Sequence, residues 1–179
     1  MKRLVIMTAL TMLLMALAAA AALAVNPGTY IPTADSFNPA NAPGSSHLTS
    51  GTPQCIVAAN LNVSCDPYVL GGVGNTNANV SLTGSYSATI DCRNHGGNVV
   101  ESHTAFFSDT NSGTVTSSRN GQLRVPSRSI SAFSAPQVCP NPNWTPLIRS
   151  GTLVLETFTY TLTFANFGSP YITITASDP

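Results

Sequence analysis

The stretch VSLTGSYSATIDC, residues 80–92, alternates between two kinds of side chain with a period of two. Apolar or small residues occupy the even positions from Val80 to Cys92, whereas Ser, Thr and Asp occupy the odd positions from Ser81 to Asp91. Successive side chains of a strand point to opposite faces of a sheet. The pattern therefore predicts a long antiparallel strand with one buried and one exposed face.

The same alternation returns near the end of the chain, where threonines occupy every second position from 157 to 163. The residues expected on the opposite, buried face are Val154, Phe158, Tyr160, Leu162 and Phe164. Further strands are expected over residues 99–107, 113–117, 122–125, 129–133 and 171–176, which are rich in strand-forming residues. The segment 109–113, DTNSG, is expected to be a turn between two of them.

No window after the first 24 residues keeps apolar residues at helical spacing, so helices are not expected there. Seven to nine short strands separated by Gly, Asn and Pro are typical of all-β domains. The sequence therefore predicts an immunoglobulin-like two-sheet antiparallel β-sandwich. A jelly roll or a small β-barrel is the alternative.

The first 24 residues have the features of a secretory signal peptide. Lys2 and Arg3 precede an apolar run over residues 4–22, and Ala22 and Ala24 are suitably placed for cleavage after residue 24. An uncleaved membrane anchor is the alternative, because the run approaches the roughly 20 residues that span a bilayer. Cleavage predicts a secreted, extracellular protein that has no contact with the membrane afterwards.

The remaining chain is long enough for one domain and carries few charges. Residues 25–179 contain five arginines, no lysine and seven acidic residues, which gives a net charge of 5 − 7 = −2. A nucleic-acid-binding protein would show a dense basic face, so this partner is not expected. Residues 25–53 contain five prolines and are expected to form a mobile or loosely docked arm or linker before a domain over residues 54–179.

Four cysteines in an exported chain predict two disulfides. Cys55 and Cys65 stand at the two ends of an expected short hairpin, where antiparallel pairing would set their sulfur atoms opposite each other. This arrangement favours the pairs Cys55–Cys65 and Cys92–Cys139. The second pair closes the longer loop and is expected to stabilise the fold by roughly 3 to 5 kcal/mol.

The run CRNHGGN at residues 92–98, followed later by VCPN at residues 138–141, resembles a pattern in small exported proteins of uncharacterised function from Gram-positive bacteria. The resemblance covers roughly residues 54–166. It implies a secreted, disulfide-bonded, β-rich protein, and it implies no catalytic residue.

Residues 90–107 contain the side chains that metal sites and Cys/His catalysis use. His95, Glu101 and His103 would provide two histidines and a carboxylate, which is a known set of zinc ligands. A solvated strand face is the alternative, and it needs no further ligand. Cys92 is expected to be oxidised and therefore not a nucleophile.

The register of the hairpin in this stretch decides between these readings. An even-membered turn over residues 94–97 would bring Glu101 and His103 onto the buried face, where an unpaired charge is costly. A three-residue turn over residues 95–97, with Gly97 at positive φ, pairs Cys92 with Val100 and leaves both side chains in solvent. The sequence predicts this second register.

Trp144 is the only tryptophan and lies in the segment CPNPNWTP, residues 139–146. A loop held by Cys139 could present Trp144 and Asn143 to a partner, or the indole could fold back over the disulfide. The sequence predicts a secreted non-catalytic domain with a binding or structural role, an unknown extracellular protein or glycan as partner, and no cofactor. The alternative is a secreted hydrolase or metal-dependent enzyme with a site around His95, Glu101 and His103.

Overall fold

The computed structural model describes residues 24–131 and 134–177, and within these ranges the regular structure consists of strands and two short 3-10 helices. The predicted all-β class is confirmed. No helix in the described ranges is both long and apolar enough to cross a membrane. The 3-10 helices are η2 Ala34–Ser36 and η3 Pro39–Asn41, and the strands are β1 Gly28–Tyr30, β2 His47–Gly51, β3 Cys55–Val57, β4 Val63–Cys65, β5 Tyr68–Gly71, β6 Ala78–Arg93, β7 Val99–Val115, β8 Leu123–Val125, β9 Arg128–Ile130, β10 Thr145–Ile148, β11 Val154–Phe164 and β12 Ile172–Ser177.

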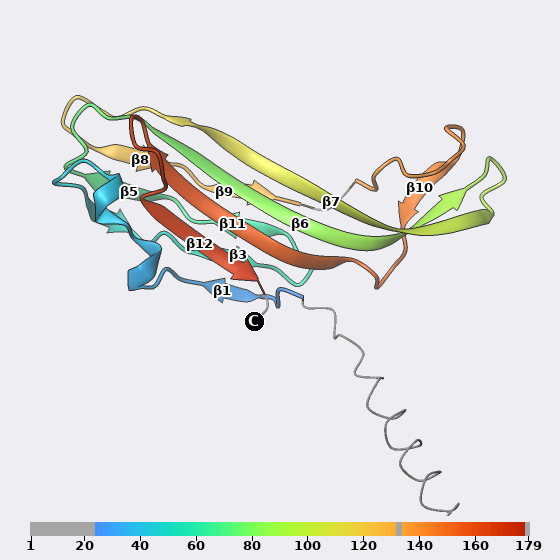
Figure 1. Ribbon diagram of the computed structural model, residues 1–179. Coiled ribbons are helices and arrows are strands. Elements are labelled where there is room, and N and C mark those ends of the chain that lie inside the picture. Colours follow the sequence, from blue (N-terminus) through green and yellow to red (C-terminus); the bar gives the residue numbers. More distant parts are fainter. Residues whose placement is uncertain (1–23, 132–133, 178–179) are drawn as a thin grey trace, which may run out of the picture.

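The strands form three antiparallel sheets (Figure 1). The largest sheet has β6 near its centre, with β7 on one side and β11 followed by β12 on the other, and β10 pairs with the last residues of β6. A second sheet has the order β1-β3-β4-β9, and a third has the order β2-β5-β8. The described strands therefore make open sheets and do not close into a barrel.

One apolar core joins the large sheet to the two smaller sheets. Leu82 of β6 and Phe158 of β11 are fully buried in it, together with Val57 of β3 and Leu70 of β5. In Figure 1 the long strands β6, β7 and β11 curve across the smaller sheets. Burial of the apolar side chains that alternate along these strands is the main favourable contribution to the fold.

The predicted buried face of β6 is confirmed, because the even positions from Val80 to Cys92 are buried. The prediction for β11 is wrong at its start. A bulge between Leu155 and Thr157 shifts the register against β6, so Leu155 is fully buried and Val154 is only partly buried. A bulge adds one residue to one strand, and alternation counted from Phe158 cannot detect it.

Strand β7 is one strand of 17 residues, whereas two strands with a turn between them were predicted. The expected turn over residues 109–113 is wrong, because these residues continue the pairing with β6. Two of their polar side chains form hydrogen bonds with the backbone of residues 129–131. Asp109 accepts a hydrogen bond from the amide of Ser131 at 2.9 Å, and the Asn111 amide group donates to the carbonyl of Ser129 at 2.9 Å.

The predicted N-terminal arm is part of the folded domain. Strand β1 pairs with β3, and β2 pairs with β5, so residues 28–51 supply edge strands to both smaller sheets. Val25 is 4% exposed, and its amide donates to the carbonyl of Leu155 at 2.7 Å. The expectation of a mobile or loosely docked arm is therefore wrong. Backbone pairing holds this segment, and all five of its prolines lie outside the strands.

Tyr30 gives a test of this docking, because its ring packs edge to face against Phe158 with centroids 5.2 Å apart. We expect Tyr30→Ala to lower the free energy of unfolding by about 1 to 3 kcal/mol, through lost apolar burial and the lost aromatic contact. The neighbouring change Ile31→Ala should stay within about 0.5 kcal/mol, since Ile31 is 63% exposed. Urea denaturation measures both, and equal stability of the two variants would mean that the segment is not docked in solution.

The predicted signal peptide, residues 1–24, lies almost wholly outside the described residues, and its cleavage stays a prediction.

Candidate functional site

The outer end of the long β6–β7 hairpin extends beyond the main core and forms a small unit of its own (Figure 1). We call residues 88–105 together with residues 134–149 the distal unit. Its small core consists of Ala88, Ile90 and Ala105, and partly buried residues that include Ile148 pack on it. This core is separate from the main core, so the distal unit depends on further attachments.

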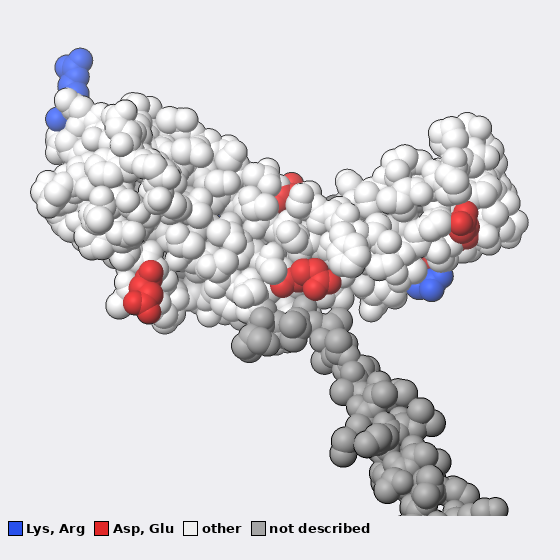
Figure 2. Space-filling model, in the orientation of Figure 1, with Lys and Arg blue, Asp and Glu red and all other residues white. Residues whose placement is uncertain are grey.

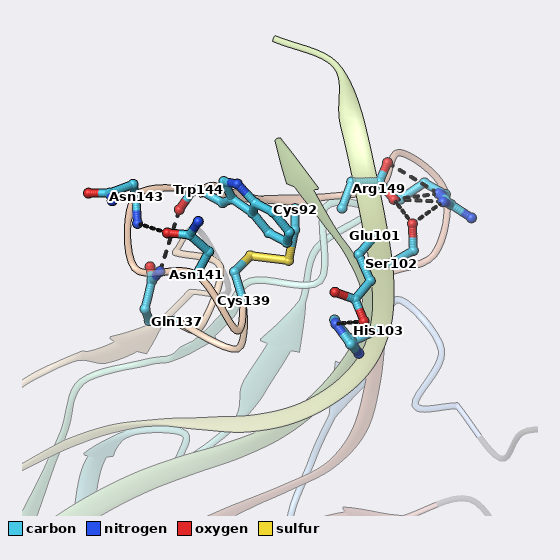
Figure 3. Close-up of a disulfide and its surroundings, with 11 residues drawn as sticks. Cys92, Glu101, Ser102, His103, Gln137, Cys139, Asn141, Asn143, Trp144 and Arg149 are labelled. Atoms are coloured by element: carbon cyan, nitrogen blue, oxygen red, sulfur yellow. Dashed lines mark hydrogen bonds and ion pairs between the residues drawn. A yellow bond between two sulfur atoms is a disulfide. The ribbon is translucent and has the colours of Figure 1, made fainter. Parts of the chain in front are cut away.

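A disulfide and a short strand provide these attachments. Cys92 of β6 is bonded to Cys139 with a Cα–Cα distance of 5.7 Å (Figure 3). Strand β10 then pairs with β6, with Pro146 opposite Cys92. The other disulfide joins Cys55 and Cys65, which face each other in the β3–β4 hairpin. Both predicted disulfide pairs are present.

The turn of the β6–β7 hairpin begins as predicted. Gly97 has a φ of 76°, and Arg93 pairs with Val99. The side chain of Asn94 closes the turn, since its Oδ1 accepts hydrogen bonds from the backbone amides of Gly96 and Asn98 at 3.0 and 3.1 Å.

A bulge directly after the turn makes the predicted register wrong. Cys92 pairs with Glu101 instead of Val100, and Ile90 pairs with His103. Because directly opposed residues in an antiparallel pair share a face, Glu101 and His103 lie on the same face as Cys92. The extra residue in β7 is the physical reason.

Glu101 and His103 remain half-exposed on that face, because the small core does not extend over them. Their side chains are 42% and 37% exposed, and the His103 Nε2 atom lies 3.1 Å from a carboxylate oxygen of Glu101 (Figure 3). His95 is exposed in the turn. Among the described residues, no three His, Cys, Asp or Glu side chains come together as metal ligands.

A polar cluster on the opposite face of the hairpin fixes β10. Asp91 is only 8% exposed, and Arg149 donates to its carboxylate from Nη2 at 2.6 Å and from Nε at 3.1 Å. Ser102 completes the cluster, because its hydroxyl donates to Asp91 at 2.8 Å and accepts from Arg149 at 2.8 Å. Asp91 lies on β6, Ser102 lies on β7, and Arg149 directly follows β10. The cluster therefore ties the two strands of the hairpin to the segment that contains β10.

These hydrogen bonds also affect the ionisation of Asp91. The bonds from Arg149 and then from Ser102 hold the pKa of the Asp91 carboxyl below its usual value. A carboxyl whose pKa is lower in the folded state stabilises the fold above its unfolded pKa, which is about 3.9, and this stabilisation is lost as the pH falls through the folded pKa.

We therefore expect Asp91→Asn to be less stable than the parent protein at neutral pH, and the difference should shrink as the pH falls below about 4. The measurement is the denaturant midpoint of both proteins at pH 7 and at pH 3. Asp35→Asn, in the 3-10 helix η2, is the control for removing one negative charge. A stability difference between parent and Asp91→Asn that does not change between the two pH values would contradict the role of this carboxylate.

The loop before β10 holds the predicted binding residues Trp144 and Asn143. Asn141 holds the backbone of this loop through two hydrogen bonds. Its carbonyl oxygen accepts from the backbone amide of Trp144 at 3.0 Å, and its side-chain Oδ1 accepts from the backbone amide of Asn143 at 2.9 Å. Asn143 is exposed and Trp144 is half-buried. In Figure 3 the indole points toward the disulfide, so one part of the ring is packed and another part faces solvent.

The hollows at Tyr68 and Arg124, and at Tyr30 and Thr175, lie on the main body of the protein. Their lining residues do not include His95, Glu101 or His103.

Comparison with known proteins gives no relative for this chain: no protein-family model, no curated protein and no solved structure matches it. The resemblance to small exported proteins of Gram-positive bacteria stays a prediction.

Proposed function

We propose that this protein is a secreted, non-catalytic domain of the immunoglobulin-like sandwich type, which binds an extracellular protein or glycan through the loop at Trp144. The observation that carries the proposal is the construction of the distal unit. A disulfide, a paired strand and the Asp91–Arg149–Ser102 cluster all attach the loop at Trp144 to the end of the long hairpin.

A loop that is ordered before binding loses little conformational entropy when a partner contacts it. Tryptophan is enriched among the residues that dominate binding energy, because its ring has a large apolar area and one hydrogen-bond donor. The exposed side-chain amide of Asn143, next to the indole, could bind hydroxyl or peptide groups of a partner. Two disulfides are typical of proteins that mature outside the cytosol.

The assignment to the sandwich type is supported by the arrangement of the sheets. The large antiparallel sheet packs across two smaller antiparallel sheets, and one core lies between the two layers. Alternating inward and outward side chains along β6 and β11 are what two packed sheets require.

A second candidate function rests on the contact between Glu101 and His103. A carboxylate 3.1 Å from an imidazole nitrogen is an arrangement that hydrolases use to orient a base. Both side chains are half-exposed, and His95 and the disulfide-bonded Cys92 do not complete the group. We therefore rank this function below binding.

The test is a binding screen of the purified domain against glycans, cell-wall preparations and extracellular proteins, followed by measurements with single variants. Trp144→Ala should weaken any confirmed interaction at least about 10-fold, the range expected when an aromatic hot spot is removed. Phe106→Ala is the matched control, because Phe106 is another aromatic residue on the hairpin and is 77% exposed.

Circular dichroism should first show that the variants are folded. If Trp144→Ala binds like the parent while His103→Ala loses binding, the site is on the hairpin and the second candidate function takes precedence.

A further inference from the structure

The outward face of the large sheet carries a regular array of hydroxyl side chains, which is separate from the distal unit. Strand pairing places these residues in three rows of four across β7, β6, β11 and β12. We call this array the hydroxyl grid, and its rows are Thr110–Thr83–Thr159–Thr175, Ser112–Ser81–Thr161–Thr173 and Ser108–Ser85–Thr157–Ser177.

None of the side chains of the grid is buried, and none of them carries a charge. The residues that alternate with them and point inward, such as Leu82, Tyr160 and Leu162, are fully or almost fully buried. Their packing in the main core fixes the strands that carry the grid. Within the grid the structure shows one direct hydrogen bond, between the hydroxyls of Thr83 and Thr110 at 3.1 Å. The other hydroxyls can form hydrogen bonds outside the sheet. Figure 2 shows charged side chains as a few separate spots on a largely uncharged surface.

The pairing fixes the spacing of the backbone positions that carry these hydroxyls. Neighbouring strands lie about 4.8 Å apart, and residues two apart along a strand are separated by about 6.7 Å. The grid therefore repeats in two perpendicular directions with two different periods. A ligand that matches all of it has a similar two-dimensional repeat and offers both donors and acceptors of hydrogen bonds. The absence of charge from the grid favours an uncharged ligand.

Water in a tetrahedral network has a similar repeat. Oxygen atoms joined by a hydrogen bond lie about 2.75 Å apart. Tetrahedral geometry then places second neighbours about 4.5 Å apart and gives a repeat of about 7.3 Å along the stacking axis of the layers. These two lengths differ from the two periods of the grid by less than about 10%.

We propose that the hydroxyl grid binds the surface of ice. Each threonine presents a hydroxyl group, which replaces one water molecule in the network, and a methyl group, which is removed from liquid water on contact. A charged side chain would hold its own hydration shell against the lattice, and the grid contains none. Sugar-binding faces commonly use flat aromatic rings, and the three rows contain no aromatic residue.

Sheet twist accumulates from strand to strand, so the match is best over the central strands β6 and β11. Thr159 lies there, opposite Thr83, and is the position at which an added ring should interfere most. Thr175 on β12 is more exposed and provides a second variant in the same row. Thr29 is an exposed threonine on β1, in a different sheet, and provides the matched control.

The experiment grows ice slowly from a solution of the full mature domain and measures the fraction of protein that enters the ice. We expect the parent protein to enter, whereas a reference protein that does not bind ice is excluded. Thr159→Tyr and Thr175→Tyr should lose incorporation, and Thr29→Tyr should retain it. Tyrosine is favourable in strands, and circular dichroism establishes that each variant is folded.

Exclusion of the parent protein from ice overturns the proposal. Incorporation of both grid variants at the level of the parent also overturns it, because the contact would then lie elsewhere. Retention of the parent on crystalline cellulose or chitin, with release by Thr159→Tyr and no incorporation into ice, would assign the grid to a polysaccharide instead. Trp144→Ala should enter ice like the parent, so this result is independent of the function proposed for the distal unit.

Discussion

Replacement of Cys92 and Cys139 by alanine in one double variant is expected to lower the free energy of unfolding by about 4 kcal/mol. The disulfide closes a loop with a sequence separation of 47 residues, and in the chain-entropy account its removal gives the unfolded chain the corresponding freedom. Denaturant unfolding of the parent and the double variant measures the difference.

The pair Cys55 and Cys65 provides a matched comparison, because it closes a loop with a separation of only 10 residues. The same account gives about 3 kcal/mol for its removal. We expect the double variant at Cys92 and Cys139 to be the less stable of the two. The reverse order would mean that the distal unit contributes little to global stability, and that it opens without unfolding the main core.

Phe158→Ala is expected to lower the free energy of unfolding by about 3 to 5 kcal/mol, which is the usual cost of removing a fully buried aromatic side chain. Phe158 is 0% exposed on the inner face of β11, and it also packs against Tyr30 of β1. Its removal therefore weakens the contact between the two layers and the docking of the N-terminal segment. Thermal or urea unfolding measures the loss.

Phe106→Ala removes the same side chain from the exposed face of β7, where Phe106 is 77% exposed. It should change the stability by no more than about 0.5 kcal/mol. Equal effects of the two substitutions would contradict the assignment of the inner and outer faces of the large sheet.

Much of the large sheet could be predicted because burial on one face imposes a period of two on the sequence. Val80 to Cys92 and the threonines from 157 to 163 show this period plainly, and both segments are strands. The Cys55–Cys65 hairpin could be predicted for a related reason, since residues that face each other across an antiparallel pair are close enough for a disulfide.

Other parts could not be predicted because their partners are distant in the sequence. Asp109 and Asn111 have the composition of a turn, and only the backbone of residues 129–131 explains why they lie in a strand. The prolines of residues 25–53 suggest a linker, but the short strands between them pair with β3 and β5. Bulges in β7 and β11 shift the register by one residue and have no clear sequence signal.

The candidate site also has parts that could be predicted from the sequence and parts that could not. The Cys92–Cys139 disulfide could be predicted as the pair that remains once the Cys55–Cys65 hairpin is assigned, and Cys139 then places the loop with Trp144 beside it. Strand β10 and the ion pair between Asp91 and Arg149 were missed, because 58 residues separate the two charged groups and residues 145–148 include a proline. The available signal was the aspartate at position 91 in the otherwise uncharged alternating stretch of residues 80–92, and it did not identify a partner.

Amide hydrogen exchange tests most directly whether the distal unit is an ordered binding platform. The informative probes are the amide of Arg149, which donates to the carbonyl of Thr89 at 2.8 Å, and the amide of Trp144, which donates to Asn141 at 3.0 Å. In the parent protein we predict that the Arg149 amide exchanges slower than in an unstructured peptide by a factor of about 100 or more, with Trp144 also protected. Exchange of both amides at the unstructured rate, while β6 and β11 remain protected, would show that the unit is not ordered before binding and would contradict the proposed function.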